Sequence, residues 1–369
     1  RDGFTSHQNA LTGFQRMGYS ITQATPSDDQ EELISLINRN FKKTNSQWFN
    51  WSHRQNPFGE NYCWLAHEES AGKLIGSTGL LARRMCYDGK PFAVGQAESI
   101  NIDVEHRSAQ AALKLQRALI AHLPDTDFNF VYGMTDTATA VFKRCRYQQV
   151  GTFRHWVKPI RTEYKFKERI SSPLLRKGVS CLADLGLRLY SQETRTFLPH
   201  QNKINFDAPI DERFEALFRE HSEGLVMVER TREFLEWRFR QEPSTRFQIM
   251  TLEDRNQRLL GYMVFVLGET GRGGDDAAGI QDFFYRDLKS LRLMMTAFSG
   301  YCRQIGMETI VISYFGREEV SKLLARFGFF QRHSQTNVFV YANPAYPDFS
   351  LEPLLDPNRW HLTNAELLS

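Results

Sequence analysis

Two stretches far apart in the chain carry the same phrase, FNWSHRQNP at residues 49–57 and LEWRFRQEP at residues 235–243. Both read Trp-x-x-Arg-Gln-x-Pro, and their tryptophans, Trp51 and Trp237, are 186 positions apart. A recurring sequence pattern at a fixed offset is the signature of a duplicated structural unit. The regions on either side of the two phrases therefore decide the fold.

The similarity extends on both sides of the phrases. Each is preceded by an alternating stretch, a turn with a proline and an amphipathic pattern, YSITQATPSDDQEELISLINRNF in the first copy and KINFDAPIDERFEALFREH in the second. Each is followed by two strand-like runs separated by a polar turn. Farther on, FKRCRYQQVG (142–151) corresponds to LARFGFFQRHS (324–334). Landmarks in the same order predict two similar domains in tandem.

Within one unit, the pattern predicts a mixed, mostly antiparallel sheet flanked by helices. In the first copy a strand, VGQAESINIDV, precedes a long amphipathic helix, SAQAALKLQRALIAHL. A strand, FNFVYGMT, a short helix, TATAVFKRCR, and a single closing strand, VGTFRHWVKPI, complete the unit.

Composition narrows the class of protein. Hydrophobic residues make up 41% and charged residues 24%, as in ordinary soluble domains, and no apolar run approaches the roughly 20 residues that span a bilayer. The five cysteines are scattered and never form Cys-x-x-Cys, and the histidines lack metal-ligand spacing. We therefore expect no metal site and a reducing, cytoplasmic location. The net charge of +3 does not by itself indicate a nucleic-acid partner.

This order of elements resembles the GNAT (GCN5-related N-acetyltransferase) superfamily in its tandem, two-domain bacterial form. The resemblance covers about residues 18–345 and implies an α/β (α+β) fold of two GNAT-like domains. It also implies an acyl-CoA-dependent N-acyltransferase, with acetyl-CoA or another acyl-CoA as co-substrate and a small amine-bearing molecule as acceptor. We expect five segments: an arm or cloning remnant (1–17), a donor-binding N-terminal domain (18–157), a basic linker with an amphipathic helix (158–202), a C-terminal domain with a degenerate donor site (203–345) and a tail (346–369).

The donor motif of the superfamily, Arg/Gln-x-x-Gly-x-Gly/Ala, corresponds to RSAQAA at residues 107–112, with Gln110 where Gly is usual. The first turn of a helix can bind phosphate because its N–H groups lack internal partners and carry the positive end of the dipole. The alternative is that Ser108 only caps a helix whose leucines enter the core. The resemblance assigns donor binding to Ile102, Val104, Arg107, Ser108, Ala109, Gln110, Ala111 and Ala112.

The second copy departs from this motif. It reads YRDLKSLRLMM, with bulky Leu288 and Leu291 at the helix start and Asp287 where a phosphate would lie. We therefore expect the donor to bind in the first domain only. The shared tryptophan phrase is then architecture, with Trp51 and Trp237 in the core.

Acyl transfer to an amine needs a base that removes a proton. The resemblance points to Glu98, on the strand before the phosphate loop, although a salt-bridge role fits it equally. The tyrosine that superfamily members often place on the later helix is replaced by Phe142, which cannot donate a proton. Nearby substitutes are Tyr132, Asp136, Cys145 and Tyr147, of which the last two fit the core better. The predicted catalytic residues are Glu98 and Asp136.

The basic linker allows two interpretations. Ser172 and Pro173 begin a helix with a leucine stripe, which either packs on a domain or docks an acidic partner such as an acyl carrier protein, a transfer RNA or anionic lipid. Two other functions also stay open: a transferase that takes its acyl group from aminoacyl-tRNA or a carrier protein, and a non-catalytic binding protein. The sequence leaves the oligomeric state open.

Overall fold

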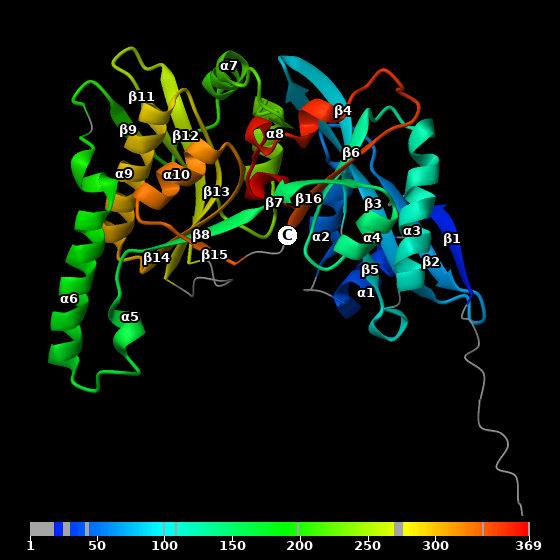
Figure 1. The fold of residues 1–369 in the computed structure, drawn as a ribbon, viewed down its shortest axis with the longest axis horizontal. Helices are drawn as coiled ribbons and strands as arrows, with labels where there is room; N and C mark the ends of the chain where they lie inside the picture. The colour runs from blue at the N-terminus through cyan, green and yellow to red at the C-terminus, as the bar shows by residue number, and fades with distance from the viewer. Residues whose placement is uncertain are drawn as a thin grey trace, which may run out of the picture.

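The structure is a computed structural model that describes residues 18–24, 30–40, 44–98, 100–107, 109–197, 199–268, 276–333 and 336–367. Two sheets lie side by side, and each carries helices on its faces (Figure 1). The α/β layout of two similar halves expected from the sequence is confirmed.

The first half contains the strands and helices that surround the first tryptophan phrase. They are β1 (Tyr19–Ala24), α1 (Gln30–Asn40), α2 (Ser46–Phe49) with a π-helical continuation (Asn50–Arg54), β2 (Tyr62–Glu68), β3 (Leu74–Tyr87), β4 (Lys90–Ala97), β5 (Asn101–Ile102), α3 (Ala109–His122), β6 (Phe130–Thr135), α4 (Thr139–Arg144) and β7 (Gln148–Thr152).

The rest of the chain begins with β8 and a helical hairpin, α5 and α6, and then repeats this order from β9 onward. Its elements are β8 (Arg154–Pro159), α5 (Glu163–Phe166), α6 (Pro173–Tyr190), β9 (Lys203–Phe206), α7 (Glu212–His221), β10 (Met227–Val228), α8 (Arg232–Phe239), β11 (Gln248–Glu253), β12 (Leu259–Leu267), β13 (Ala277–Tyr285), α9 (Leu288–Ile305), β14 (Thr309–Gly316), α10 (Glu318–Arg326), β15 (Phe330–Arg332), β16 (Asn337–Ala342) and β17 (His361–Leu362).

The two sheets exchange strands. The first sheet runs β1-β2-β3-β4-β6-β16-β7, and the second runs β15-β8-β14-β13-β12-β11-β9. The single closing strand predicted at residues 150–160 is therefore wrong. The strand is interrupted at Phe153, which is fully buried. As a result β7 stays in the first sheet and β8 pairs in the second. In return, β16 of the second half lies between β6 and β7.

The two tryptophan phrases meet between the halves. The rings of Trp51 and Trp237 stack with centroids 4.9 Å apart and an interplanar angle of 20°. The Trp51 indole donates a hydrogen bond to the Trp237 carbonyl at 2.8 Å, and the Trp237 indole donates to the Trp51 carbonyl at 3.0 Å. Both side chains are buried, as predicted. The repeated phrase thus forms a reciprocal joint that holds the halves together.

The C-terminal segment returns between the two halves. It continues from β16 to β17, and buried Trp360 anchors it by donating to the Leu354 carbonyl at 2.7 Å. Arg238 donates to the carbonyls of Ala365 and Leu367 at 3.0 and 2.8 Å. This segment therefore packs as part of the fold.

Candidate functional site

A notch opens in the first sheet where two parallel strands separate. β4 and β6 pair in parallel over residues 94–97 and 130–133. Beyond Ala97 the chain stays with β3, because Asn101 and Ile102 pair with Ser77 and Gly76. β6 instead continues along β16 to Thr135. Among the described residues, no strand pairs with the β4-facing edge of Met134 and Thr135, so backbone groups at this edge remain available.

The corresponding notch in the second sheet is filled by the chain itself. β13 and β14 pair in parallel over residues 277–280 and 309–312 and then separate. There β17 pairs with the end of β14, with Leu362 opposite Phe315 and His361 opposite Gly316. On the other side, the His361 ring donates from Nε2 to the Phe283 carbonyl of β13 at 2.8 Å. The C-terminal segment thus pairs with β14 at the position where, among the described residues, the corresponding edge of β6 has no strand partner.

The loop that follows the notch also differs between the halves. In the first half residues 103–108 connect β5 to α3. Asp103 fixes the start of this loop, because Arg39 donates to its two carboxylate oxygens at 3.1 and 3.0 Å. Arg107 is exposed, and its Nε donates to the Ile102 carbonyl at 3.2 Å. Its guanidinium therefore stands just before the first turn of α3.

In the second half only Arg286 and Asp287 connect β13 to α9. The Asp287 carboxylate caps α9 by accepting from the amide and the hydroxyl of Ser290 at 2.8 and 2.9 Å. Partial burial acts to raise the pKa of Asp287, but these hydrogen bonds outweigh it and hold the pKa below its usual range. A permanent carboxylate at this helix start would repel a phosphate.

The residues assigned to donor binding fall into two groups. Val104, Arg107 and Gln110 are exposed, with Val104 65% exposed, so their side chains can meet a ligand. Ile102, Ala111 and Ala112 are buried in the core of the first half and can contribute only backbone groups. Ser108 and the side chain of Ala109 lie outside the described residues.

Glu98 lies at the point where the notch opens. Its amide donates to the Gly79 carbonyl at 2.9 Å, and its carboxylate lies over Gly79, where Oε2 would be 2.6 Å from an added Cβ. A side chain at position 79 would force this carboxylate to shift. The strand predicted through Glu98 is interrupted, because β4 ends at Ala97 and β5 begins at Asn101. Side chains therefore do not alternate between buried and exposed along this stretch, because the neighbours Asn101 and Ile102 are both buried.

The structure adds His53 to the site, which the sequence analysis did not select. His53 packs edge-on against Phe49 with ring centroids 4.3 Å apart. Burial lowers the pKa of His53; Glu98 opposes this shift and Arg83 adds to it, so the imidazole is neutral near pH 7. Within the described chain, no hydrogen bond reaches its buried Nδ1. A comparison of the two phrases could have revealed this residue, because the second copy has Phe239 in its place.

The other sequence candidates are mostly structural. Phe142 packs against Gly133, where its Cε1 would be 2.7 Å from an added Cβ. Cys145 is buried, and the buried Tyr147 hydroxyl accepts a hydrogen bond from Gln116 at 2.6 Å, in line with the core roles favoured for both. Burial raises the pKa of Tyr147 and also that of Tyr132.

Asp136, the second predicted catalytic residue, is exposed. It follows the end of β6 directly, beyond the edge that Met134 and Thr135 leave unpaired on the notch side. The structure thus places Asp136 at the outer end of the notch, whereas Glu98 lies where the notch begins.

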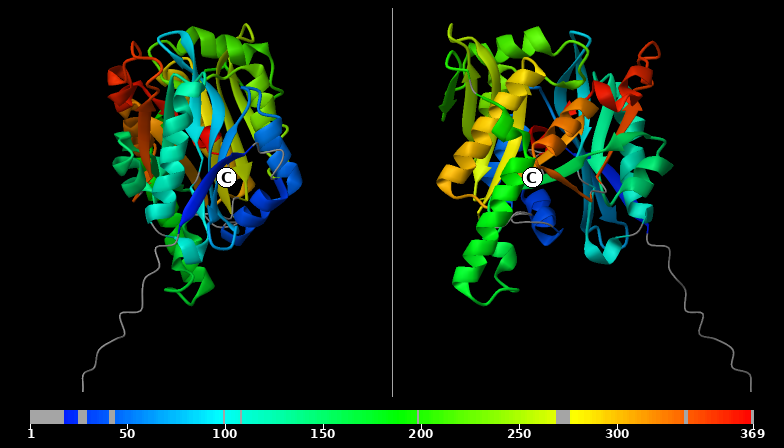
Figure 2. Two further views of the ribbon diagram at one scale, coloured as in Figure 1. Left: turned by 90° about the vertical axis from the view of Figure 1, so that its right-hand side faces the viewer. Right: turned by 60° about the vertical axis from the view of Figure 1, so that its left-hand side comes forward.

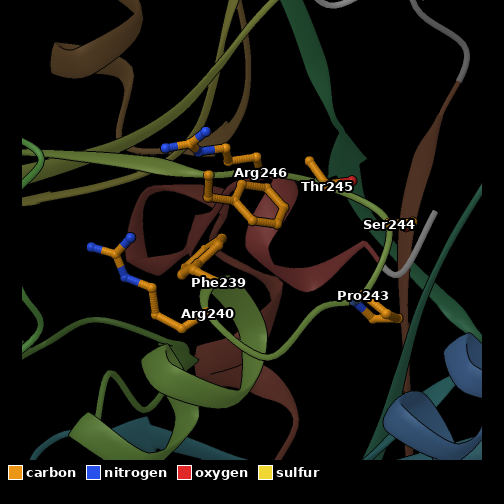
Figure 3. Close-up of a pocket in the computed structure, with 7 residues that line it drawn as sticks. Phe239, Arg240, Pro243, Ser244, Thr245 and Arg246 are labelled. Carbon is orange, nitrogen blue, oxygen red and sulfur yellow. The ribbon is translucent and has the colours of Figure 1, made fainter.

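Two cavities are found away from this notch. One of about 350 Å³ lies in the loop after α8, where Phe239, Arg240 and Arg246 surround it (Figure 3). The other, of about 370 Å³, lies at the start of α9 beside Asp287. Both are shallow and belong to the second half. The assignment of a site to the first half therefore rests on the separated strands and on the loop before α3.

Comparisons with known proteins agree on the fold. No protein-family model and no curated protein matches the chain. Among solved structures, 88% of this chain matches an Enterococcus faecalis protein described as a probable N-acyltransferase, at 10% identity over 72% of that chain, with a TM-score of 0.61. A GCN5-related N-acetyltransferase from Anabaena variabilis matches equally well, at 12% identity over 73% of that chain, with a TM-score of 0.61.

A third match is a Saccharomyces cerevisiae N-myristoyltransferase with bound myristoyl-CoA, at 11% identity over 79% of that chain, with a TM-score of 0.57. Identities this low show the fold alone. The chain is thus a two-domain α/β protein of the acyltransferase-like class of folds. Its particular fold is that of the GCN5-related N-acetyltransferases, as the sequence predicted.

The described part of the chain holds no helix long and apolar enough to cross a membrane. Nor do the residues of that part bring three or more His, Cys, Asp or Glu side chains together as a metal site.

Proposed function

We propose that the chain is an acyl-CoA-dependent N-acyltransferase whose donor binds in the notch of the first half. The observation that carries the proposal is the difference between the two notches: β17 fills the second, whereas the edge of Met134 and Thr135 stays unpaired in the first. The fold shared with a transferase that has bound myristoyl-CoA supports the same class of donor.

Two parts of coenzyme A, the pantetheine arm and the pyrophosphate, have a matching group at this site. The pantetheine arm carries amides, which can pair with the open edge of β6 as a neighbouring strand would. The pyrophosphate fits the first turn of α3, where free N–H groups and the helix dipole favour an anion. Arg107 would add a charge-assisted hydrogen bond to it.

Glu98 is the proposed base. It would remove a proton from the ammonium form of the acceptor, directly or through a water, so that the amine can attack the thioester carbonyl. The new C–N bond then replaces the C–S bond, and coenzyme A leaves as a thiolate that takes up a proton. Asp136, at the outer end of the notch, is the second candidate for proton transfer.

The acceptor we propose is a small amine, and the acyl group is acetyl or a longer chain. Cys86, Cys145, Cys181 and Cys302 are free thiols, which suits the reducing cytoplasm as the location of the protein.

The experiment is a calorimetric titration of the full chain with coenzyme A, acetyl-CoA and a long-chain acyl-CoA. Gln110→Glu keeps the size of an exposed side chain and adds a negative charge beside the pyrophosphate. We expect it to weaken binding about tenfold or more, as for loss of a favourable helix-terminus charge interaction in a partly buried site. Gln110→Gly should bind like the parent. Ala111→Asp is unsuitable, because Ala111 is fully buried and the charge would disturb the core.

The control is Lys289→Glu, which also places a glutamate at the second residue of a helix, α9, although it changes the charge by two units instead of one. It should leave binding unchanged. A folded parent that binds none of these compounds would contradict the proposal and favour a non-catalytic binding protein. A donor lost with Lys289→Glu but kept with Gln110→Glu would move the site to the second half.

A further inference from the structure

Helix α6 presents its apolar side to solvent. Figure 1 shows it at the outer edge of the second half, away from the first half. Leu174 is 84% exposed, Leu182 is 73% exposed and Leu175 is 66% exposed. The exposed side is formed by Leu174, Leu175, Gly178, Val179, Cys181, Leu182, Leu185, Gly186, Leu189 and Tyr190. At 100° per residue these positions cover about half the circumference of the helix. This exposed side, called the leucine face below, contains no charged residue.

The opposite side of α6 is polar and packs on the protein. Arg176 donates to Glu163 of α5 at 3.2 Å, and Asp184 accepts from the amide and the hydroxyl of Thr162, both at 2.8 Å. Ser180 is buried on the same side. An amphipathic helix on a soluble domain normally turns its apolar side inward. The linker helix thus packs on the protein, in line with the first of its two interpretations, but it does so through its polar side and not through its leucine stripe.

An apolar face of this size indicates a binding surface. The segment after the helix carries another large exposed apolar side chain, Phe197, which is 83% exposed. The α5–α6 hairpin also reaches beyond the sheets, as both views of Figure 2 show. A flat or curved surface outside the molecule can therefore reach the leucine face without meeting the sheets.

The charges around the leucine face are mostly positive. Exposed Lys177 and Arg188 lie along one border of the face. Residues 161–190 contain seven Lys or Arg and three Asp or Glu. Two of the three acids, Glu163 and Asp184, are engaged on the inner side of α6. A leucine face bordered by cations is the pattern of helices that lie in the interface of anionic membranes.

A second copy of this chain fits the face less well. In an antiparallel pair of α6 helices centred near Leu182, Lys177 of one copy would meet Arg188 of the other. No acid on the leucine face could compensate this repulsion, and like charges at close range cost binding energy. A parallel pair would bring each cation close to its own counterpart. Anionic lipid headgroups instead satisfy every cation at the border.

From this arrangement we infer that α6 binds an anionic lipid surface, with its leucine face in the membrane interface and Lys177 and Arg188 at the headgroups. The inference goes beyond the proposed transferase activity and does not depend on it. It makes the chain a peripheral membrane protein that reaches the lipid through the second half.

The test is flotation of the full chain with vesicles of phosphatidylcholine alone and of phosphatidylcholine with about one quarter phosphatidylglycerol. We expect binding to the anionic vesicles and much weaker binding to the neutral ones. Leu182→Gln with Leu185→Gln should abolish binding, whereas Ile305→Gln, at another exposed apolar residue, should not. Lys177→Gln with Arg188→Gln should weaken binding roughly twentyfold, since each cation near an anionic surface contributes roughly fivefold.

Lys322→Gln with Arg326→Gln removes two exposed cations from α10 and is the matched charge control, which should bind like the parent. All these sites are on the surface, so circular dichroism should show every variant folded. Absence of flotation, or flotation that survives the leucine double variant, would overturn the inference. A dimer in light scattering that this variant converts to monomer would also overturn it, because a second copy would then cover the face.

Discussion

The two halves of the chain contain the same notch and use it differently. In the second half the C-terminal segment fills the notch through β17, and the loop before α9 is reduced to Arg286 and Asp287. In the first half no strand of the described residues pairs with the end of β6 on its β4 side, and a longer loop, residues 103–108, precedes α3. The duplication has thus kept the tryptophan joint in both copies, while only one copy keeps a backbone edge that a ligand could pair with.

The filled notch is sealed by buried charges. Arg230 donates to both carboxylate oxygens of Asp282 at 3.0 Å and to Glu366 at 2.7 Å, and all three side chains are fully buried. Burial raises the pKa of Glu366 despite the opposing charge of Arg230. For Asp282, burial acts in the same direction, but Arg230 outweighs it and lowers the pKa. The C-terminal segment is therefore held in the second notch by Arg230, which forms ion pairs with both Asp282 and Glu366.

The largest effect should come from breaking this seal. Arg230→Met keeps the length of the side chain but leaves Asp282 and Glu366 buried without their cation. We expect the free energy of unfolding to fall by about 3–5 kcal/mol, as for other buried pairs that lose one partner. Urea unfolding of the full chain measures the change.

Arg232→Met is the control, because Arg232 makes an exposed ion pair with Glu212 and its loss should cost at most about 1 kcal/mol. Equal losses for the two variants would show that the charges in the second notch do not hold the C-terminal segment in place.

The second largest effect should be a loss of stability of the second half at acidic pH. Burial lowers the pKa of His361 to about 4, despite the opposing charge of Asp282. As the pH falls below about 6.5, the unfolded chain therefore takes up a proton before the folded chain does. Above about pH 6.5 His361 adds no pH dependence to the free energy of unfolding. Between about pH 6.5 and 4 the lowered pKa of His361 reduces the free energy of unfolding by about 3 kcal/mol.

His361→Gln, which can still donate to the Phe283 carbonyl, should flatten the fall in stability over this pH range. His200→Gln, at an exposed position, should leave it unchanged. If His361→Gln shows the same loss as the parent, another group carries the acid sensitivity.

How far the sequence could predict these differences depends on the kind of interaction. The repeated phrase and the order of elements predicted two GNAT-like halves, because hydrophobic periodicity fixes local structure. Alternation shows that β8 is a strand but does not name its partner, so the strand exchange was missed. The filling of the second notch by β17 is a contact between distant segments and has no local signal. A comparison of the two copies position by position would, however, have pointed to His53, since Phe239 replaces it.

The open notch leads to a prediction about rate. Glu98→Gln keeps the shape of the side chain and removes the proposed base, so kcat should fall roughly 10²-fold while donor affinity is unchanged. His53→Phe introduces the residue of the second copy. It should remove the part of the acidic limb of the parental pH–rate profile that protonation of His53 contributes, below about pH 6.5, because burial and, to a smaller degree, Arg83 disfavour the charged imidazole.

Once a small amine is found that serves as acceptor, steady-state kinetics together with donor titrations separate an effect on kcat from an effect on binding. Parental turnover by Glu98→Gln from about pH 6 to 9 would make Glu98 structural. Asp136→Asn would then be the next variant to test.

The smallest effect concerns what the halves share. Trp51→Phe and Trp237→Phe each remove one of the two reciprocal hydrogen bonds and part of the stacked rings. Each should lower the free energy of unfolding by about 1–2 kcal/mol, the sum expected for one buried hydrogen bond and reduced ring packing. Because the joint is reciprocal, we expect the two costs to agree within about 0.5 kcal/mol and the double variant to cost less than their sum. Unfolding by urea of the two single variants and the double variant gives all three values. If the two single variants lost clearly different amounts of unfolding free energy, the difference between the filled and the open notch would extend to the tryptophan joint. The halves would then differ even where their sequences agree.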